Sequence, residues 1–382
     1  MILLHDKMST QNELISQSKV QAVLQDPISA KIHQVLNGDY SYQITMHCNN
    51  PILKKLEYLS IIQSNSGQLF FLNHISKQGR TVTLYCPHIW YYLAHRPVWC
   101  GAHEGYDIWD SVRDILQDEK RDEREIHYNF SFASDISNKW INWDYHLLKK
   151  AYALLGSPES IVNRFNGELY RDNFYFSINK RIEHSADDAF YLADGFNATS
   201  INEDIDASDM ITEVYATDNY GGLYDAFWGW SDKFPHHMTG TPKFSYNGEP
   251  NLREDADKYF YENVEPKHSL RVNFATLRKS NRESPYMQLE NFQLGDTGKI
   301  RSSVLDIDVT DRIIELTYDD LRNVNESCAL GNKLPSAWGE NRYDKLLAKD
   351  DSPGRRLDVL EKAQNDNITR EDIQNLFATD TE

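Results

Sequence analysis

The sequence predicts a mainly β protein with α+β parts, and three observations support this fold class. Residues 1–98 contain several short alternating segments that turn residues separate. The stretch Ser157–Arg181 predicts a short helix that runs directly into a strand. Residues 287–331 contain two further strand patterns after a Gly-Asp turn. Short strands at regular spacing are typical of small antiparallel barrels or sandwiches.

Composition and charge narrow the class of function. The chain has 382 residues, a hydrophobic fraction of 40% and a formal net charge of −18. Its apolar content is sufficient for a packed core. A surface this acidic repels nucleic acid and anionic membranes, so we expect no stable nucleic-acid binding. No apolar run is long enough for a transmembrane helix and the first residues have no signal-peptide pattern, which predicts no membrane anchor and synthesis in the cytoplasm.

Residues 1–98 predict a small barrel or sandwich. The segment YSYQITMHC places Tyr42, Ile44 and Met46 on one face of a strand, and Asn37-Gly38 forms a tight-turn signal before it. Three more strand segments follow: LEYLSIIQS, GQLFFLNHI and RTVTLYCPHI. We expect these strands to pair in antiparallel order.

Residues 99–156 predict a mixture of helix and strand. A helix is expected where apolar residues recur at helical spacing, at Ile108, Val112, Ile115 and Leu116. The segment HYNFSFASDI predicts a strand. A second helix is expected over WDYHLLKKAYALLG, with its apolar face at Leu147, Leu148, Ala151 and Leu154 and its end at Gly156.

The stretch Ser157–Arg181 completes this small α/β part. Ser157 is a natural N-cap, and Pro158 suits the first position of a helix. Asn166-Gly167 can end the helix in a left-handed turn. The strand that follows is expected to place four apolar residues inward: Leu169, Phe174, Phe176 and Ile178.

Two groups of residues contain side chains of the types that bind metal ions. The first contains Cys86, His88, His95, Cys100 and His103, whose spacings match no standard zinc pattern. The second occupies ligand positions of a twelve-residue calcium loop: Asn202, Asp204, Asp206, Ser208 and Glu213. That loop has Ala207 where the turn requires glycine, and it lacks flanking helices. We therefore predict strand ends and turns at both places, with no metal site and no cofactor.

The region from Gly221 to Pro285 is rich in Gly, Tyr and Trp and predicts a long ordered loop or a small insertion. Four aromatic residues there could stack on a glycan or a partner protein: Tyr224, Phe227, Trp228 and Trp230. The alternative, which we favour, is that these rings are buried against the barrel.

The last strands are expected after the turn at Gly295-Asp296. One strand is predicted through Val304, Ile307 and Val309, and RIIELTYD predicts a second. The polar tail, residues 332–382, predicts two short amphipathic helices.

No catalytic motif is present. The chain has no H-E-x-x-H, no G-x-S-x-G and no P-loop, and its four cysteines stand in no catalytic context. We therefore expect that the protein is not an enzyme. A cell-wall hydrolase with an unrecognised site and a carbohydrate-binding host-recognition module remain as alternatives.

Several segments, taken in order, resemble the segments of one known protein family. The first is the opening MILLHDK followed by VLNGDYSYQITM, and GQLFFLNHI and HIWYYL come next. The helix-to-strand stretch NGELYRDNFYFSI resembles the segment with which the family enters its second barrel. The segment Gly195–Tyr215 is similar to another family segment, although Glu213 stands where the family usually has a basic residue. The family's closing motif is matched by Leu294-Gly295-Asp296-Thr297, Arg312, Thr317-Tyr318-Asp319, Leu321 and Leu330-Gly331. Together these segments resemble the prophage tail endopeptidase family, whose members form the hub of the tail-associated lysin (Tal) of long-tailed phages.

The resemblance implies a division of the chain into five parts. These are a first β-barrel at 1–98, a small α/β domain at 99–178, a second β-barrel at 179–222 and 288–331, an insertion at 223–287 and a helical segment at 332–382.

The resemblance also implies a function and a set of partners. We expect a structural virion protein at the distal tip of a phage tail, a homotrimeric baseplate hub that contacts the hexameric distal tail protein and the tape measure protein. A receptor-binding protein is a further expected partner, and the phage DNA is expected to pass through the hub without stable binding.

Overall fold

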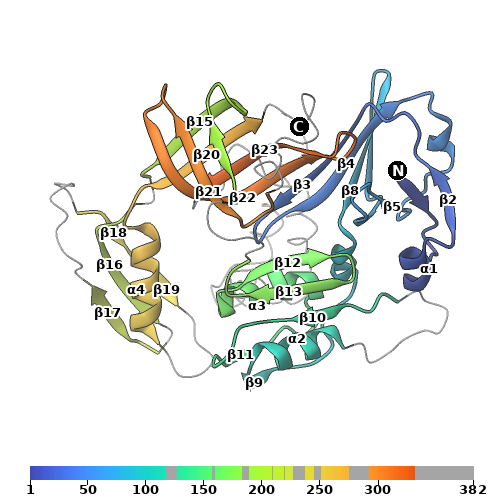
Figure 1. Ribbon diagram of the computed structural model, residues 1–382. Coiled ribbons are helices and arrows are strands. Elements are labelled where there is room, and N and C mark those ends of the chain that lie inside the picture. The colour runs from blue at the N-terminus through green and yellow to red at the C-terminus, as the bar shows by residue number, and fades with distance from the viewer. Residues whose placement is uncertain are drawn as a thin grey trace, which may run out of the picture.

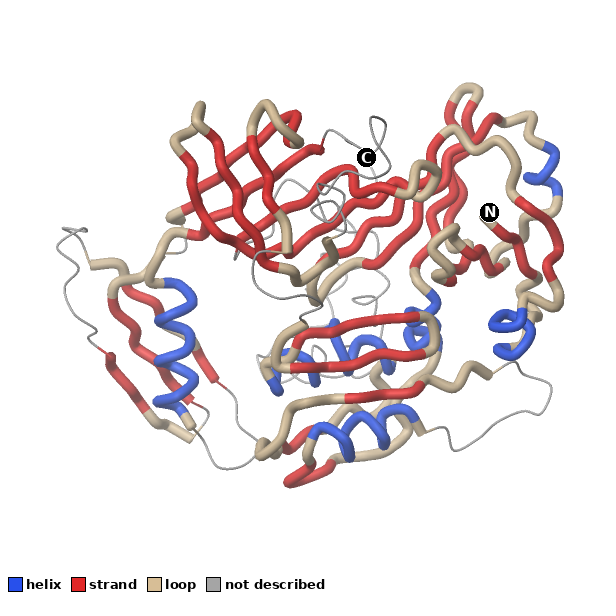
Figure 2. The backbone as a smooth tube through the Cα atoms, viewed as in Figure 1, coloured by secondary structure: helices blue, strands red, loops and turns tan. Residues whose placement is uncertain are grey.

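A computed structural model of the protein describes residues 1–117, 127–156, 160–182, 189–208, 210–218, 220–226, 237–244, 251–274 and 292–331. Most of the regular structure in these residues is β-strand, which confirms the predicted class (Figures 1 and 2). None of the described helices is long and apolar enough to span a bilayer. The predicted helices of residues 332–382 lie outside the described residues.

A large sheet runs through the centre of the molecule and includes strands from both ends of the chain (Figure 1). Its strand order is β15 Ala198–Asp206, β20 Lys267–Phe274, β23 Val324–Gly331, β22 Ile307–Asp319, β3 Ser29–Val35, β4 Tyr40–His47, β8 Thr81–Pro87 and β7 His74–Gln78. On β4 the predicted inward face is confirmed, because Tyr42, Ile44 and Met46 are all 0% exposed.

Strand β22 connects the two halves of this sheet. Its first half pairs with β21 Thr297–Ser302, which also pairs with β14 Tyr191–Ala193, and its second half pairs with β3. The sequence predicted two strands here, but the structure has one continuous strand. The prediction was also wrong for Val304, which lies in the turn before β22 and is 84% exposed. That turn forms because Asp306 adopts a left-handed φ of 55° and the Leu305 amide donates to the Ser302 hydroxyl.

The first half of the chain also forms a smaller sheet, which lies beside β4 and β8 (Figure 1). Its order is β2 Val20–Val23, β1 Leu3–His5, β5 Ile61–Gln63 and β6 Leu69–Phe71. Helix α1, Gln11–Ser16, begins with a capping box in which Thr10 and Glu13 bond each other's backbone amides. Two short 3₁₀ helices complete this part: η1 Pro51–Lys54 and η2 Ile89–His95.

The α/β part follows and has a three-stranded sheet, β10 Ser131–Ala133, β13 Tyr175–Asn179 and β12 Glu168–Asp172. A second pair joins β9 His103–Tyr106 to β11 Ile141–Trp143. Helix α2, Ile108–Leu116, agrees with the prediction, and α3, Ile161–Phe165, begins after Ser160 and ends at Asn166 with a left-handed φ of 55°. The single strand predicted after α3 is instead a hairpin, because Asn173 adopts a φ of 50° between β12 and β13. Ser157 and Pro158 lie outside the described residues.

The helix predicted over WDYHLLKKAYALLG is wrong for its first half, residues 143–149. Leu147 has a φ of 60° and is 57% exposed, and its amide donates to the Val98 carbonyl at 2.9 Å. The first half of the segment is therefore a turn held against Val98, and the chain is helical only from Lys150, continuing as the π-helical η3 Tyr152–Gly156. Lys150 then caps α2, since its buried ammonium donates to the Leu116 and Gln117 carbonyls at 2.9 and 3.1 Å.

A separate small unit lies to one side of the central sheet (Figure 1). It contains β16 Glu213–Asp218, β17 Leu223–Ala226, β18 Thr239–Gly240, β19 Lys243–Phe244 and α4 Leu252–Asn263. Its core is its own and consists of Ile211, Val214, Ala216, Ala256 and Phe260. The predicted insertion bounds, 223–287, differ from the strand pairing: β16 pairs within this unit, whereas β20 completes the central sheet between β15 and β23.

Candidate functional site: a junction of three parts of the chain

A bidentate ion pair joins the α/β hairpin to the long strand β22. The two guanidinium nitrogens of Arg312 contact the two carboxylate oxygens of Glu168 at 2.5 and 2.6 Å. Both side chains are mostly buried, with exposed fractions of 18% and 16%. The Glu168 carboxylate also accepts from the backbone amide of Ile182 at 2.6 Å. A paired fork of this kind fixes orientation as well as distance.

The turn at Gly295 lies against the same ion pair. Arg312 donates to the Gly295 and Ile182 carbonyls, at 2.8 Å in each case. Gly295 has a φ of 91°, and an added Cβ would lie 2.6 Å from the Ile182 carbonyl oxygen. Glycine is therefore required both by the backbone conformation and by the close approach of the two chain segments. Three segments that the resemblance singled out, around Glu168, Gly295 and Arg312, thus meet at one place.

A second arginine, Arg171, holds the other side of the hairpin that β12 and β13 form. Arg171, on β12, is 6% exposed and donates to the Tyr91 hydroxyl at 3.0 Å and to the Gly38 carbonyl at 2.9 Å. Its guanidinium also lies over the rings of Tyr40, Trp90 and Tyr91, 5.4 to 5.6 Å from their centres. The cation–π contacts fix the hairpin against β4 and η2, and the bond to Gly38 fixes it against the turn between β3 and β4.

The hairpin tip is bonded to the first half of the chain. Asn173 accepts from the Leu69 amide at 2.7 Å, and Asp172 accepts from the Gln68 side chain at 2.8 Å. Nearby, the buried carboxylate of Asp320 accepts from the Tyr42 hydroxyl at 2.6 Å and from the Asn65 amide at 2.9 Å. The end of β22 is thereby fixed to the turn that precedes β6.

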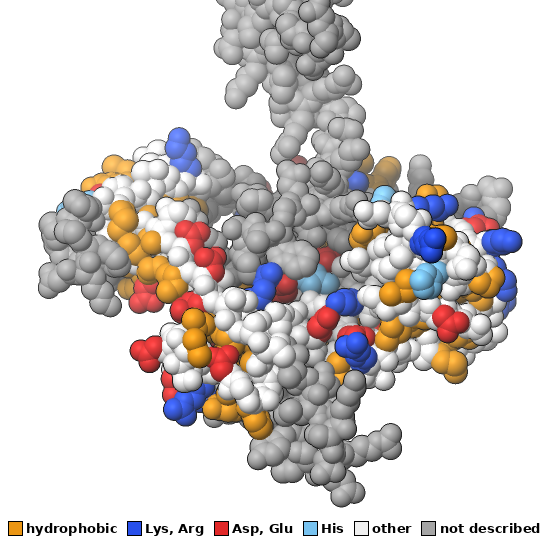
Figure 3. Space-filling model, turned by 90° about the horizontal axis from the view of Figure 1, so that it is seen from above, with side chains coloured by type: hydrophobic (Ala, Val, Ile, Leu, Met, Phe, Trp, Pro, Cys, Tyr) orange, Lys and Arg blue, Asp and Glu red, His pale blue; other side chains and the backbone are white. Residues whose placement is uncertain are grey.

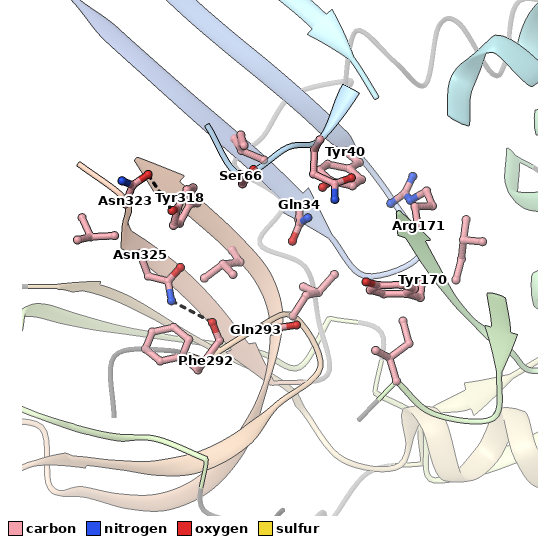
Figure 4. Close-up of a pocket in the computed structure, with 17 residues that line it drawn as sticks. Gln34, Tyr40, Ser66, Tyr170, Arg171, Phe292, Gln293, Tyr318, Asn323 and Asn325 are labelled. Carbon is pink, nitrogen blue, oxygen red and sulfur yellow. Dashed lines mark hydrogen bonds between the residues drawn. The ribbon is translucent and has the colours of Figure 1, made fainter. Parts of the chain in front are cut away.

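A cavity of about 670 Å³ lies where these parts meet (Figure 4). Its walls come from β3, β12, the end of β22, the start of β23 and residues 292–294. Five of its lining side chains are apolar and buried: Ile32, Leu169, Ile182, Phe292 and Leu316. Amides and tyrosines provide most of the polar lining, such as Gln34, Gln293, Asn325, Tyr170 and Tyr318. Among the described residues that line it, Arg171 is charged and none is acidic.

His33 connects the two halves of the central sheet through ion pairs with two carboxylates. His33, on β3, lies 3.1 Å from Asp39 through Nδ1 and 3.1 Å from Glu315 of β22 through Nε2. Arg271 of β20 approaches the other oxygen of Glu315 at 3.7 Å. Burial by itself lowers the pKa of His33, but the hydrogen bonds and charges of the two carboxylates outweigh it and raise the pKa to about 9.

This arrangement predicts a stability that depends on pH. Because the pKa of His33 is higher in the folded chain, its contribution is fully present below the unfolded pKa of about 6.5. The contribution is lost as the pH rises through about 9. We expect wild type to lose on the order of 2 kcal/mol more than His33→Gln between pH 6.5 and pH 9.5. Chemical unfolding of both proteins at the two pH values measures this difference; equal losses would show that His33 is not charged in the folded state.

The residues that the sequence marked as an aromatic contact surface do not gather at this junction. Tyr224 is partly buried, and its ring packs against the core of the small unit beneath α4. The ring is therefore packed within the small unit and not against the barrel, the position that we favoured. Phe227, Trp228 and Trp230 lie outside the described residues.

The residues considered for metal binding have other surroundings. His88 is fully buried, stacks on Tyr40 with ring centres 4.3 Å apart and lies 3.1 Å from the Gln68 side chain. Burial lowers the pKa of His88 well below its usual value. Asn202, Asp204 and Asp206 lie in strand β15, which pairs with β20, and so they form no loop. No cluster of potential metal ligands occurs in the described part of the chain.

Among the solved structures that match the chain, three tail proteins share its fold over most of its length. The prophage tail protein gp18 from Listeria monocytogenes EGD-e is 14% identical, with a TM-score of 0.60, and the match covers 88% of this chain and 95% of gp18. The 43 kDa tail protein of prophage MuSo2 from Shewanella oneidensis is 10% identical, with a TM-score of 0.57 and coverage of 86% and 97%. A tail protein from Neisseria meningitidis MC58 is 8% identical, with a TM-score of 0.57 and coverage of 86% and 95%.

The sequence itself gives a shorter match. No curated protein matches the chain. The family described as prophage endopeptidase tail matches residues 243–338, a range that includes α4, β20 and the strands β21 to β23. The resemblance to the prophage tail endopeptidase family is thus confirmed, by the family match over residues 243–338 and by a fold shared with prophage tail proteins over most of the chain.

Proposed function

We propose that this protein is a structural component of a phage tail, namely the trimeric hub of the tail tip. The observation that carries the proposal is the junction, where Glu168, Gly295 and Arg312 hold three parts of the chain in a fixed arrangement. Each of these residues stands in a segment that resembles the hub family. The fold shared with the prophage tail proteins supports the same function.

The domain division proposed from the sequence is compatible with this role. A first barrel at 1–98 and a second one at 179–222 and 288–331 would flank the α/β domain. Strand β16 would then belong to the small unit inserted in the second barrel, and β20 would be part of that barrel. Three copies with two barrels each would present six similar walls. Such a ring matches a hexameric distal tail protein, and we propose that protein, the tape measure protein and a receptor-binding protein as partners. The site of action would be the distal tip of the virion.

The net negative charge of the chain is suited to a channel through which DNA passes. A basic wall would hold phosphates through many ion contacts, whereas each copy of this chain carries −18. On the face shown in Figure 3, acidic and basic side chains of the described residues are interspersed. We therefore propose that the acidic excess lies on the surfaces that line the channel of the trimer.

The assembly state provides the first test. Native mass spectrometry or light scattering of the purified protein should give about three times 44.4 kDa. Class averages from electron microscopy should show a ring or cup with threefold symmetry. A monomer at all concentrations, even with the distal tail protein present, would contradict the hub, and tight binding to duplex DNA at physiological salt would contradict the acidic channel.

The family's description mentions an endopeptidase, so a lytic function is the second candidate. We expect the purified chain to release no fragments from host cell walls, because the sequence carries no catalytic motif. A zymogram on host cell walls measures this activity. Clearing that is abolished by mutating a single carboxylate or thiol would establish a hydrolase and overturn this expectation.

A further inference from the structure

The junction cavity is open at a polar rim and apolar at its floor. Ser66, Gln293 and Asn323 line it and are exposed, whereas Leu169 and Leu316 line it and are buried. Its volume of about 670 Å³ lies within the range of roughly 300–1,000 Å³ that is typical of small-molecule pockets. A small ligand can therefore enter at the rim and reach the apolar side chains.

The described lining offers a ligand no free charge. Arg171 is its charged member, and the guanidinium of Arg171 is already bound to the Tyr91 hydroxyl and the Gly38 carbonyl. No carboxylate occurs among the described lining residues. Because a charged group that enters such a site loses its hydration without gaining a partner, its burial is unfavourable. The lining therefore selects for an uncharged ligand.

Carboxamides provide most of the hydrogen-bonding groups of the lining. They belong to Gln34, Gln68, Gln293, Asn323 and Asn325. The Gln293 backbone amide donates to Asp296, but within the described residues the Gln293 carboxamide makes no hydrogen bond. A carboxamide donates through its nitrogen and accepts through its oxygen, and so it is suited to hydroxyl groups, which also do both. A ligand with several hydroxyl groups matches this lining.

Two tyrosines lie on opposite sides of the cavity, with Gln34 and Gln293 between them (Figure 4). Tyr170 is on β12 and Tyr318 is on β22, and both are partly exposed. Aromatic rings pack against apolar C–H surface, while a phenol hydroxyl remains available as a polar group. A neutral sugar ring has both of the parts that this arrangement requires, because its C–H groups form an apolar face and its hydroxyls surround that face.

We propose that the junction cavity binds a neutral saccharide. The rings of Tyr170 and Tyr318 contact the C–H face of the sugar, and Gln34 and Gln293 exchange hydrogen bonds with its hydroxyls. The inference goes beyond the proposed hub and does not depend on the trimer, because all of these residues belong to one copy. A free sugar and a sugar within a cell-surface glycan share this chemistry, so ligands of both sizes are needed to distinguish them.

Titration calorimetry and saturation-transfer NMR measure the binding. The probes are glucose, galactose and N-acetylglucosamine, together with linear oligomers of glucose and of N-acetylglucosamine. Glucose 6-phosphate is the charged probe, and it should bind more weakly than glucose. Tighter binding of an oligomer than of its monomer would identify a glycan chain as the ligand, and equal binding would identify a single sugar.

Variants at the cavity locate the bound sugar. Gln293→Trp closes the entrance with a large ring and should abolish binding. Gln78→Trp, at an exposed glutamine on β7, is the matched control and should leave binding unchanged. Gln293→Leu removes a hydrogen bond and should weaken binding about 5-fold. Tyr170→Leu should weaken it about 10-fold, while Tyr170→Phe, which keeps the ring, should have a smaller effect.

Three results would overturn the inference. The first is that folded wild type binds none of the neutral probes at their highest soluble concentration. The second is binding that Gln293→Trp retains, which would place the sugar elsewhere on the molecule. The third is glucose 6-phosphate that binds as tightly as glucose, which would show that the site does not select against charge. Gln293 is exposed, so its variants should melt at the wild-type temperature and keep the test decisive even if Tyr170→Leu fails to fold.

Discussion

Arg312→Met is expected to lower the free energy of unfolding by about 3 kcal/mol. The substitution leaves the carboxylate of Glu168, whose exposed fraction is 16%, without its cation. It also removes the donors to the Gly295 and Ile182 carbonyls. An unpaired charge at this depth keeps its desolvation cost and loses its compensation. Chemical unfolding followed by tryptophan fluorescence measures the difference.

Three controls define the origin of this loss. Arg312→Lys keeps the charge but cannot form the paired fork, so its cost should lie between those of wild type and Arg312→Met. The double variant Glu168→Gln, Arg312→Met should cost less than the sum of the single variants, because the two residues act on each other. At the exposed pair of Lys31 and Glu326, Lys31→Met should cost less than about 1 kcal/mol. A loss at Arg312 no larger than the loss at Lys31 would show that the ion pair does not hold the junction.

The sequence predicted well those elements whose pattern is local. Strand β4 has one polar and one apolar face, and helix α2 has apolar residues at helical spacing, so both could be identified without knowledge of their neighbours. The segment at Leu147 shows where this fails. Its apolar spacing fits a helix, but backbone hydrogen bonds with Val98 hold it in a turn. Propensity is a weak preference that such contacts override.

The junction could be predicted only in part. Glu168 and Arg312 are 144 residues apart, and no spacing rule relates them. Both stand in segments that resemble one family, so the resemblance marked the residues without showing that they meet. The small unit was missed as a fold because its strands β18 and β19 have only two residues each, too few for alternation to be visible. The cavity has no linear signal, since its lining comes from segments throughout the chain.

The second large loss of stability is expected on substitution of Asp320, whose side chain links the end of β22 to the first half of the chain. Its side chain is 0% exposed and accepts from the Tyr42 hydroxyl at 2.6 Å and the Asn65 amide at 2.9 Å. Burial and the nearby Asp320 carboxylate raise the pKa of Tyr42, so its hydroxyl stays protonated and donates.

Asp320→Ala is therefore expected to lower the free energy of unfolding by about 3 kcal/mol, because it leaves buried donors without an acceptor. Tyr42→Phe removes one donor together with its need for a partner, and should cost only about 1 kcal/mol. Asp308→Ala is the matched control, since that carboxylate is 53% exposed. Chemical unfolding compares the three variants. If Asp320→Ala costs no more than Asp308→Ala, the buried carboxylate is not what fixes β22 to the turn at Asn65, and the packing of β3 against β22 must hold the two halves together instead.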